Sequence, residues 1–204
     1  MLTLYGISAS RAMRNLWLLE ELGLDYHQEP VDFRNGGTET AELLALNPNG
    51  RIPVLRDGDL VLYESMAINL YLASRYAGDS GLWPADPAAQ GLAYQWSFWV
   101  MSEVEQPLLT VLMHKRVLPE ERRDAQKLAR NTGLLRRPFA VLEQALAQRD
   151  MLLGDAFSIA DLNVAAVLSW ARAARMDLAA YPRLTTWVKA CMARPAFRSA
   201  NRKP

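Results

Sequence analysis

Two neighbouring residues, Glu64 and Ser65, have the chemistry of an amino-acid binding site. They directly precede the apolar helical pattern MAINLYLASRY. A serine at that position caps a helix, and the free N–H groups of the first turn attract an anion. The Glu64 carboxylate stands where it can meet an ammonium group. The pair suits a ligand that carries an α-amino and an α-carboxylate group side by side; the alternative is an ordinary helix cap preceded by a surface acid.

A second candidate lies in the segment Arg51-Ile52-Pro53-Val54. A proline just ahead of a strand can form a cis peptide bond, which usually serves a purpose. The residue before it, Ile52, then exposes a backbone N–H and C=O that can pair with a peptide ligand as an added strand does. The alternative is a plain trans bond at the entry to the strand.

Three hydroxyl groups follow the first apolar run of the chain, those of Tyr5, Ser8 and Ser10. Ser10 stands at the start of a helical pattern, where the helix dipole favours negative charge. Its hydroxyl can donate to a bound thiolate or can serve as a helix cap. Arg11 and Arg14 flank the same helix start, where they can meet a ligand carboxylate or remain solvated.

Several other chemistries are excluded by the motifs that the sequence lacks. Gly-x-Ser-x-Gly and the glycine-rich phosphate loops do not occur. His27 and His114 have no ligand spacing, so no metal site is expected. Cys191 is the single cysteine and lies in an apolar helical pattern, which favours a buried structural thiol over a nucleophile.

Composition and charge limit the location and the partners. The formal net charge of +1 implies no bulk attraction to nucleic acid or to an anionic membrane. No apolar run is long enough to span a membrane, and the start MLTLYGIS does not resemble a signal peptide. A single cysteine fits a reducing compartment, so we expect a cytoplasmic protein.

The elements that position these residues differ between the two parts of the chain. The first part alternates strands and helices, and its Asp-Gly turn at residues 57–58 indicates a hairpin. The order is β-α-β-α-β-β-α, with mixed parallel and antiparallel pairing, which is the order of a thioredoxin-like domain. The expected strands are 2–5, 26–32, 52–56 and 60–63, and the expected helices are 11–22, 39–46 and 66–76.

Beyond a turn-rich linker the sequence contains helical patterns only. We expect helices at about 88–113, 119–148 with a kink at Pro138, 159–175 and 181–193. Ser158 and Asp161 have the spacing of a capping box at the start of the third of these. The predicted fold is therefore an α/β domain over residues 1–78 followed by an all-α domain over residues 87–204.

Taken together, four motifs resemble the cytosolic glutathione transferases over nearly the whole chain. They are LYG…SRAMRNLWLLEELGL, NPNGRIPVL, YES before a helix and LLGDAFSIADL, in the order and at the spacings of that family. The segment SRAMRNLWLL is similar to the serine-using bacterial and fungal branches, which favours Ser10 as the thiol-activating residue, ahead of Ser8 and then Tyr5. No cysteine precedes residue 191, which disfavours the disulfide-reducing cysteine branch.

The resemblance implies roles for the remaining candidates. Pro53 would form the cis bond, and Ile52 would pair with the cysteinyl backbone of glutathione. Glu64 and Ser65 would hold the γ-glutamyl amine and carboxylate, while Arg51 would lie near the glycyl carboxylate. The helical domain would supply the pocket for a hydrophobic electrophile, with candidates in an aromatic-rich helix that also suit a core or an interface: Trp96, Trp99, Met101 and Glu105.

The resemblance further implies a homodimeric enzyme that uses glutathione as a co-substrate, with no metal or redox cofactor. The aromatic-rich segment YQWSFWVM and the apolar face of the helix at 65–76 also point to a dimer. Two alternatives share the fold. One is a glutathione-dependent peroxidase or disulfide reductase, and the other is a non-catalytic regulatory protein that binds glutathione.

Overall fold

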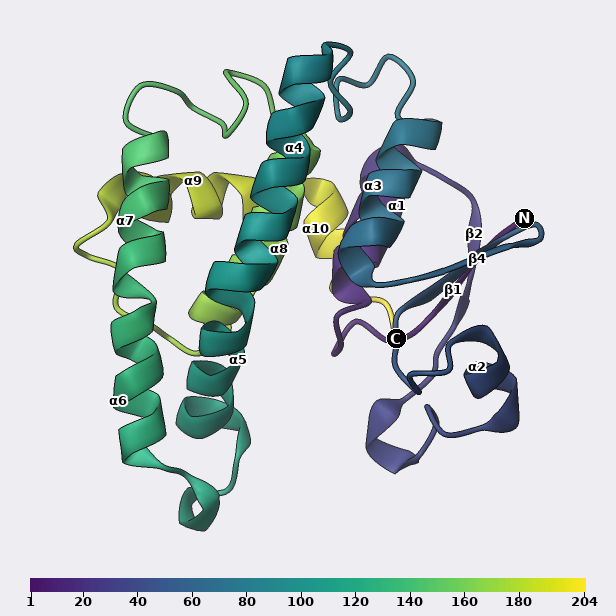
Figure 1. Cartoon of the computed structure of the whole chain (residues 1–204), viewed down its shortest axis with the longest axis horizontal. Coiled ribbons are helices and arrows are strands. Elements are labelled where there is room, and N and C mark those ends of the chain that lie inside the picture. The colour runs from purple at the N-terminus through teal and green to yellow at the C-terminus, as the bar shows by residue number, and fades with distance from the viewer. The chain divides into compact units, whose positions relative to one another are not determined.

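The chain forms two compact units in the computed structural model, which describes residues 1–204 apart from the side chain of Asn35. The first unit comprises Met1–Trp83 together with Ala193–Pro204, and the second comprises Pro84–Met192. Figure 1 shows a sheet with helices in the first unit and helices alone over most of the second. The sequence prediction differs here, because it placed residues 193–204 in the second domain.

The first unit is built on a four-stranded mixed sheet in the order β2-β1-β3-β4. Strand β1 pairs in parallel with β2 and antiparallel with β3, and β3 pairs antiparallel with β4. This arrangement confirms the predicted thioredoxin-like fold. Strand β2 ends earlier than expected and β3 starts later, because Pro30 and Pro53 have no N–H for the ladder. The strands are β1 (Leu2–Tyr5), β2 (Tyr26–Glu29), β3 (Val54–Asp57) and β4 (Leu60–Tyr63).

Helices cover both faces of this sheet. Figure 1 shows α1 and α3 on one side and α2 on the other. Helix α1 buries the continuous run 16–19 against the core and ends at Gly23, whose φ of 60° lies in the left-handed region that favours glycine. A short 3₁₀ turn, Phe33–Asn35, precedes α2. The helices are α1 (Met13–Leu22), α2 (Ala41–Leu46) and α3 (Ser65–Tyr76).

A last helix, α10 (Pro195–Ala200), also belongs to the first unit. The Phe197 ring packs edge-on against Trp17 of α1 with 4.8 Å between ring centroids. Arg194, just ahead of α10, forms a bidentate ion pair with Glu21 of α1, with N···O distances of 2.6 and 2.8 Å. The ion pair joins residues 173 positions apart, and the ring contact spans a similar distance in sequence, so no local pattern indicated them.

The second unit is helical throughout its regular structure. Helix α4 (Pro87–Trp99) continues through a wider π-type segment, Val100–Glu105, into α5 (Gln106–Leu112). The predicted helix at 119–148 is divided into α6 (Ala125–Leu134) and α7 (Arg136–Ala145), which are separated by one residue. Pro138 lies in the first turn of α7, where proline is tolerated. Helices α8 (Ile159–Ala173) and α9 (Pro182–Met192) complete the unit.

Helix α8 forms the centre of the second unit, with most of its residues buried. Its start confirms the predicted capping box, because Asp161 accepts hydrogen bonds from both the backbone N–H and the hydroxyl of Ser158. Cys191 of α9 is buried, as expected for a structural thiol. Among the described residues, no helix is both long and apolar enough to cross a membrane, and no cluster of histidine, cysteine and acidic side chains suits a metal ion.

Candidate functional site

The predicted binding residue Ser65 starts helix α3 and lies at the centre of a buried polar cluster. Its side chain is 3% exposed. Its Oγ accepts a hydrogen bond from Nη1 of Arg14 at 3.1 Å, and its carbonyl accepts one from the Asn15 side chain at 2.8 Å. The amide of Asn15 also donates to the Asn69 side chain at 2.7 Å. Helix α1 thus fixes the position of the first turn of α3 through polar contacts.

Glu64 has an unusual backbone conformation, with φ of 72° and ψ of 113°. A positive φ strains any residue with a Cβ, and such residues are concentrated at functional sites. The Glu64 carbonyl accepts the first α-helical hydrogen bond of α3, from Ile68 at 2.9 Å. The side chain of Glu64 is exposed beside the first N–H groups of α3, which have no acceptor within the helix. An acid and a set of free N–H donors therefore stand side by side.

The Ile52–Pro53 peptide bond is cis, as the resemblance implied. The loop ahead of it is held by Asn47, a buried residue that donates from Nδ2 to the Arg51 carbonyl at 2.7 Å. Asn47 also accepts hydrogen bonds from the backbone and the side chain of Asn49. Ile52 is half-buried, and the Arg51 side chain is exposed.

Gly6 brings strand β1, helix α1 and Ile52 close together. Its φ is 142°, and a Cβ added there would lie 2.6 Å from Cβ of Ala12 and 3.6 Å from Cβ of Ile52. Glycine is required by both this conformation and this close approach. The loop that carries Ser8 and Ser10 therefore begins next to Ile52.

The three predicted hydroxyl groups have different surroundings. Ser10 is half-buried, and its Oγ donates to the Ile7 carbonyl at 2.7 Å and accepts from the Ala12 N–H at 3.1 Å. These bonds are local and cap the turn that leads into α1. Ser8 instead donates its hydroxyl to the carbonyl of Lys203 at 2.8 Å. Arg11, half-buried, follows Ser10 in the same turn.

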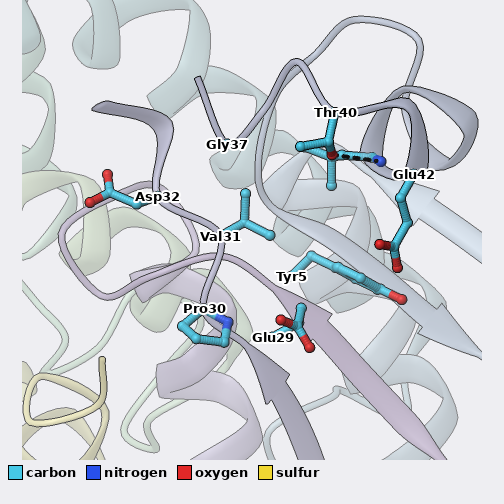
Figure 2. A pocket seen from close by; sticks show the side chains of 9 residues that line it. Tyr5, Glu29, Pro30, Val31, Asp32, Gly37, Thr40 and Glu42 are labelled. Carbon is cyan, nitrogen blue, oxygen red and sulfur yellow. Dashed lines mark hydrogen bonds between the residues drawn. The ribbon is translucent and has the colours of Figure 1, made fainter. Parts of the chain in front are cut away.

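Tyr5 faces a different region. Its side chain alternates with the buried Leu4 along β1, so it leaves the opposite face of the sheet. Figure 2 shows its ring running toward the carboxylate of Glu42 in a pocket of about 350 Å³. Ile52, Glu64 and Ser65 are not among the residues that line this pocket. The Tyr5 side chain therefore lies in a pocket that these three residues do not line, although its backbone pairs with Val54, next to Pro53.

The pocket beside Tyr5 has an acidic lining at the ends of β1 and β2. Asp32 in this lining is bound by Arg34, whose side chain donates to both carboxylate oxygens. These hydrogen bonds hold the pKa of Asp32 below its usual value. The acid is thus already paired within the chain.

The four predicted electrophile contacts lie in the second unit, at the end of α4 and in the wider turn that follows. Trp96 and Trp99 form an edge-to-face pair with 5.1 Å between centroids. Trp96 and Glu105 are buried, while Trp99 and Met101 are half-buried. Wider helical turns of this kind often occur at functional sites.

Three asparagines that no sequence motif indicated, Asn15, Asn47 and Asn69, support the predicted binding residues. Each is buried and hydrogen-bonded beside a predicted binding residue. One signal was available, since Arg14 and Asn15 interrupt an otherwise apolar helical run, and polar residues on a buried face require partners.

Comparisons with known proteins identify the family of the chain. Residues 1–74 match the family model for the glutathione S-transferase N-terminal domain, and residues 100–195 match that for the C-terminal domain. Glutathione S-transferase 3 of Zea mays is 38% identical over 208 residues, which is 97% of this chain and 91% of the relative. Glutathione S-transferase GstB of Escherichia coli K12 is 33% identical over 97% of this chain and 96% of its own.

A similar solved structure is the theta class glutathione S-transferase of Xanthomonas axonopodis pv. citri with glutathione bound. It is 31% identical to this chain, with a TM-score of 0.90, and the match covers 100% of this chain and 98% of that protein. The sequence matches and the fold extend over both units. The chain therefore belongs to the glutathione S-transferase family of enzymes.

Proposed function

We propose that this enzyme activates the thiol of glutathione at the loop between β1 and α1 and directs it to a hydrophobic electrophile. The observation that carries the proposal is the arrangement around the start of α3. Glu64 and Ser65 adjoin the free N–H groups of the first turn, and the Arg14 guanidinium donates a hydrogen bond to Oγ of Ser65. This arrangement suits an ammonium and a carboxylate on one carbon, as in the γ-glutamyl group.

In this proposal each end of the tripeptide has its own contacts. The γ-glutamyl carboxylate accepts from Ser65 and from the first N–H groups of α3, and its ammonium group meets Glu64. The cysteinyl backbone pairs with Ile52 beside the cis Pro53, as an added strand pairs with a sheet edge. Arg51 and Arg11 supply positive charge for the remaining carboxylate and the thiolate.

Ser10 is the proposed thiolate donor. A thiol with an ordinary pKa near 8.5 is only about 3% ionised at pH 7. A hydroxyl that donates to the thiolate lowers this pKa, and the nearby start of α1 favours the negative charge as well. To donate, the Ser10 proton must leave the Ile7 carbonyl, exchanging a neutral hydrogen bond for a stronger charge-assisted one.

The proposed second substrate is a small hydrophobic electrophile, with Trp96, Trp99, Met101 and Glu105 as its candidate contacts. Conjugation needs only an activated thiol and proximity, so the proposal includes no metal or redox cofactor. A cytoplasmic location is part of it, because glutathione is kept reduced there.

Retention on a glutathione-affinity resin, followed by three parallel assays, tests the proposed function. An aryl halide, a hydroperoxide and a mixed disulfide are compared at equal enzyme concentration, with glutathione as the common co-substrate. We expect the aryl halide to give the highest turnover. Retention with turnover of only the hydroperoxide or the mixed disulfide would replace conjugation by peroxidase or reductase chemistry.

We also propose that the enzyme is a homodimer. Phe98 and Tyr94 lie one turn apart on α4 and are 65% and 43% exposed, and neighbouring exposed aromatic side chains often mark an interface. Helix α3 offers little apolar surface for this interface, because Met66, Ile68 and Leu72 on its apolar face are buried.

A further inference from the structure

Ser8 forms two hydrogen bonds with residues 203–204, one from its backbone N–H and one from its hydroxyl. Its backbone N–H donates to the Pro204 oxygen at 2.7 Å, and its hydroxyl donates to the Lys203 carbonyl at 2.8 Å. The contact joins positions 195 residues apart in the sequence. The Ser8 hydroxyl is therefore part of a contact between distant segments, whereas the Ser10 hydroxyl donates locally, to Ile7.

Strand β2 contributes to the same contact through Gln28. The side-chain amide of Gln28 donates to the Gly6 carbonyl at 2.9 Å and to the Pro204 oxygen at 3.1 Å. The Gly6 N–H donates to the Glu29 carbonyl at 2.9 Å. The loop at residues 6–10 is thus held by β2 at Gly6 and by residues 203–204 at Ser8.

Residues 199–204, called the 199–204 segment below, are themselves bound to helix α1. The Ser199 hydroxyl donates to Glu20, and Nζ of Lys203 lies 3.2 Å from a carboxylate oxygen of Glu20. Partial burial acts to raise the pKa of Glu20, but hydrogen bonds from Ser199, Tyr26 and Lys203 outweigh it, so the net pKa is lowered. Glu20 is therefore a charged anchor at neutral pH.

We infer that the 199–204 segment positions the loop that carries Ser10, and that Ser8 is a positioning residue rather than the thiolate donor. Ser8 and Ser10 are separated by one residue, so fixing the backbone of Ser8 restricts where the Ser10 hydroxyl can lie. The inference rests on the proposed function, in which Ser10 donates to the glutathione thiolate. It adds a long-range support for that hydroxyl, made by residues far from the ligand in sequence.

Deletion of Lys203 and Pro204 tests the inference while leaving Ser8 and Ser10 intact. The pKa of the enzyme-bound glutathione thiol is measured by thiolate absorbance against pH, together with the glutathione dissociation constant and the melting temperature. A second variant, Gln28→Leu, loosens the same loop from strand β2. Arg202→Ala is the matched control, because Arg202 is exposed in the same segment.

We expect both the deletion and Gln28→Leu to raise the bound thiol pKa by at least about half a unit, and each half unit lowers the thiolate fraction at pH 6.5 by up to roughly threefold. The glutathione dissociation constant should change less than about twofold, because both changes leave the proposed contacts at residues 52, 64 and 65 intact. The Arg202→Ala variant should match the wild type.

Two results would overturn the inference. A lower melting temperature with an unchanged thiol pKa would mean that the segment only stabilises the fold. A lower thiol pKa after the deletion would mean that the freed Ser8 hydroxyl is the thiolate donor. The wild-type titration separates these results from a failure of the proposed function, in which the wild type itself would bind no glutathione.

Discussion

The guanidinium of Arg14 donates from Nη1 to Oγ of Ser65 at 3.1 Å, and both side chains are buried. Because Oγ accepts from Arg14, the single proton of the Ser65 hydroxyl is not used in this bond and can be donated to another group. The buried guanidinium also adds positive charge next to the N–H groups at the start of α3. Arg14 is thus expected to support carboxylate binding without touching the ligand.

Arg14→Met should therefore weaken glutathione binding. Loss of a hydrogen bond to a charged group and of the nearby charge predicts a cost of about 1.5–3 kcal/mol, or roughly a tenfold or greater rise in the dissociation constant. Isothermal titration calorimetry measures it, with melting curves to check folding. Arg56→Met, at an exposed arginine of β3, is the control. Equal affinity in a folded Arg14→Met variant would remove Arg14 from the site.

Glu64 is expected to favour glutathione binding at a cost to folding stability, because its φ of 72° is strained. Glu64→Ala should weaken glutathione binding by about 1.5–3 kcal/mol, the range for a lost charge-assisted hydrogen bond. Glu64→Gly should bind as weakly but should be more stable than Glu64→Ala by about 1 kcal/mol, since glycine adopts a positive φ without strain.

Calorimetric titration and urea denaturation of both Glu64 variants separate the two effects. Glu39→Ala, at an exposed acid ahead of α2, serves as the control for binding. Unchanged affinity in both variants would make Glu64 a surface acid only. A glycine variant less stable than the alanine variant would remove the argument from strain.

Asp161 is the buried acceptor that joins the start of α8 to α9 and to the preceding loop. Its carboxylate accepts from the Leu152 N–H at 2.8 Å, from Trp187 Nε1 at 3.0 Å, and from Ser158. Asp161→Asn should lower the free energy of unfolding by about 1–3 kcal/mol, because an amide N–H₂ cannot accept these bonds. Urea denaturation measures this cost, and Asp155→Asn, at an exposed acid, should have no effect.

The pH dependence of this cost has a defined sign. Burial raises the pKa of Asp161 above its ordinary value of 3.8, and the hydrogen bonds offset this only in part. The folded state then binds more protons than the unfolded state between the two pKa values. The contribution of Asp161 to stability is therefore full below 3.8 and falls as the pH rises through the raised pKa. The cost of Asp161→Asn should be larger near the acid end of this window than at neutral pH; the opposite trend would contradict the sign.

The fold and the site differ in how far the sequence could predict them. The capping box of Ser158 and Asp161 is a local pattern, and the structure confirms it. The Asp-Gly hairpin between β3 and β4 is equally local and is also confirmed. The direction of Tyr5, by contrast, depends on which face of the sheet is buried, which a four-residue strand does not reveal. Tyr5 therefore lines a pocket that neither Ser8 nor Ser10 lines, although all three are close in sequence.

Long-range contacts account for most of what the sequence did not reveal. The binding of Ser8 by Lys203 and the pairing of Glu21 with Arg194 each join opposite ends of the chain. Neither contact has a periodic or motif signal, because each residue type is ordinary at its position. Residues 193–204 thus seemed to continue a helical domain, although their packing partners are in the first unit.

The proposed dimer can be tested through the most exposed aromatic residue of α4. Phe98→Glu should shift the enzyme toward the monomer, because it places a charge where an apolar contact is expected. Sedimentation velocity at micromolar concentration measures the change. Gln95→Glu, at an exposed polar position of the same helix, is the control. A wild-type protein that sediments as a monomer at this concentration would contradict the dimer itself.

The role of Ser10 is the central claim, and the titration of the bound thiol tests it most directly. Thiolate absorbance of the glutathione complex is followed against pH in wild type, Ser10→Ala, Ser8→Ala and Tyr5→Phe. The Ser10→Ala variant should bind glutathione nearly as well as wild type, but its bound thiol pKa should rise by about one to two units, a loss of roughly 1.4–2.7 kcal/mol of thiolate stabilisation. Tyr5→Phe should leave the curve unchanged, and Ser8→Ala should shift it less than Ser10→Ala. A Ser10→Ala curve that superimposes on the wild-type curve, with a shift in only the Ser8 or Tyr5 variant, would show that Ser10 is just a helix cap.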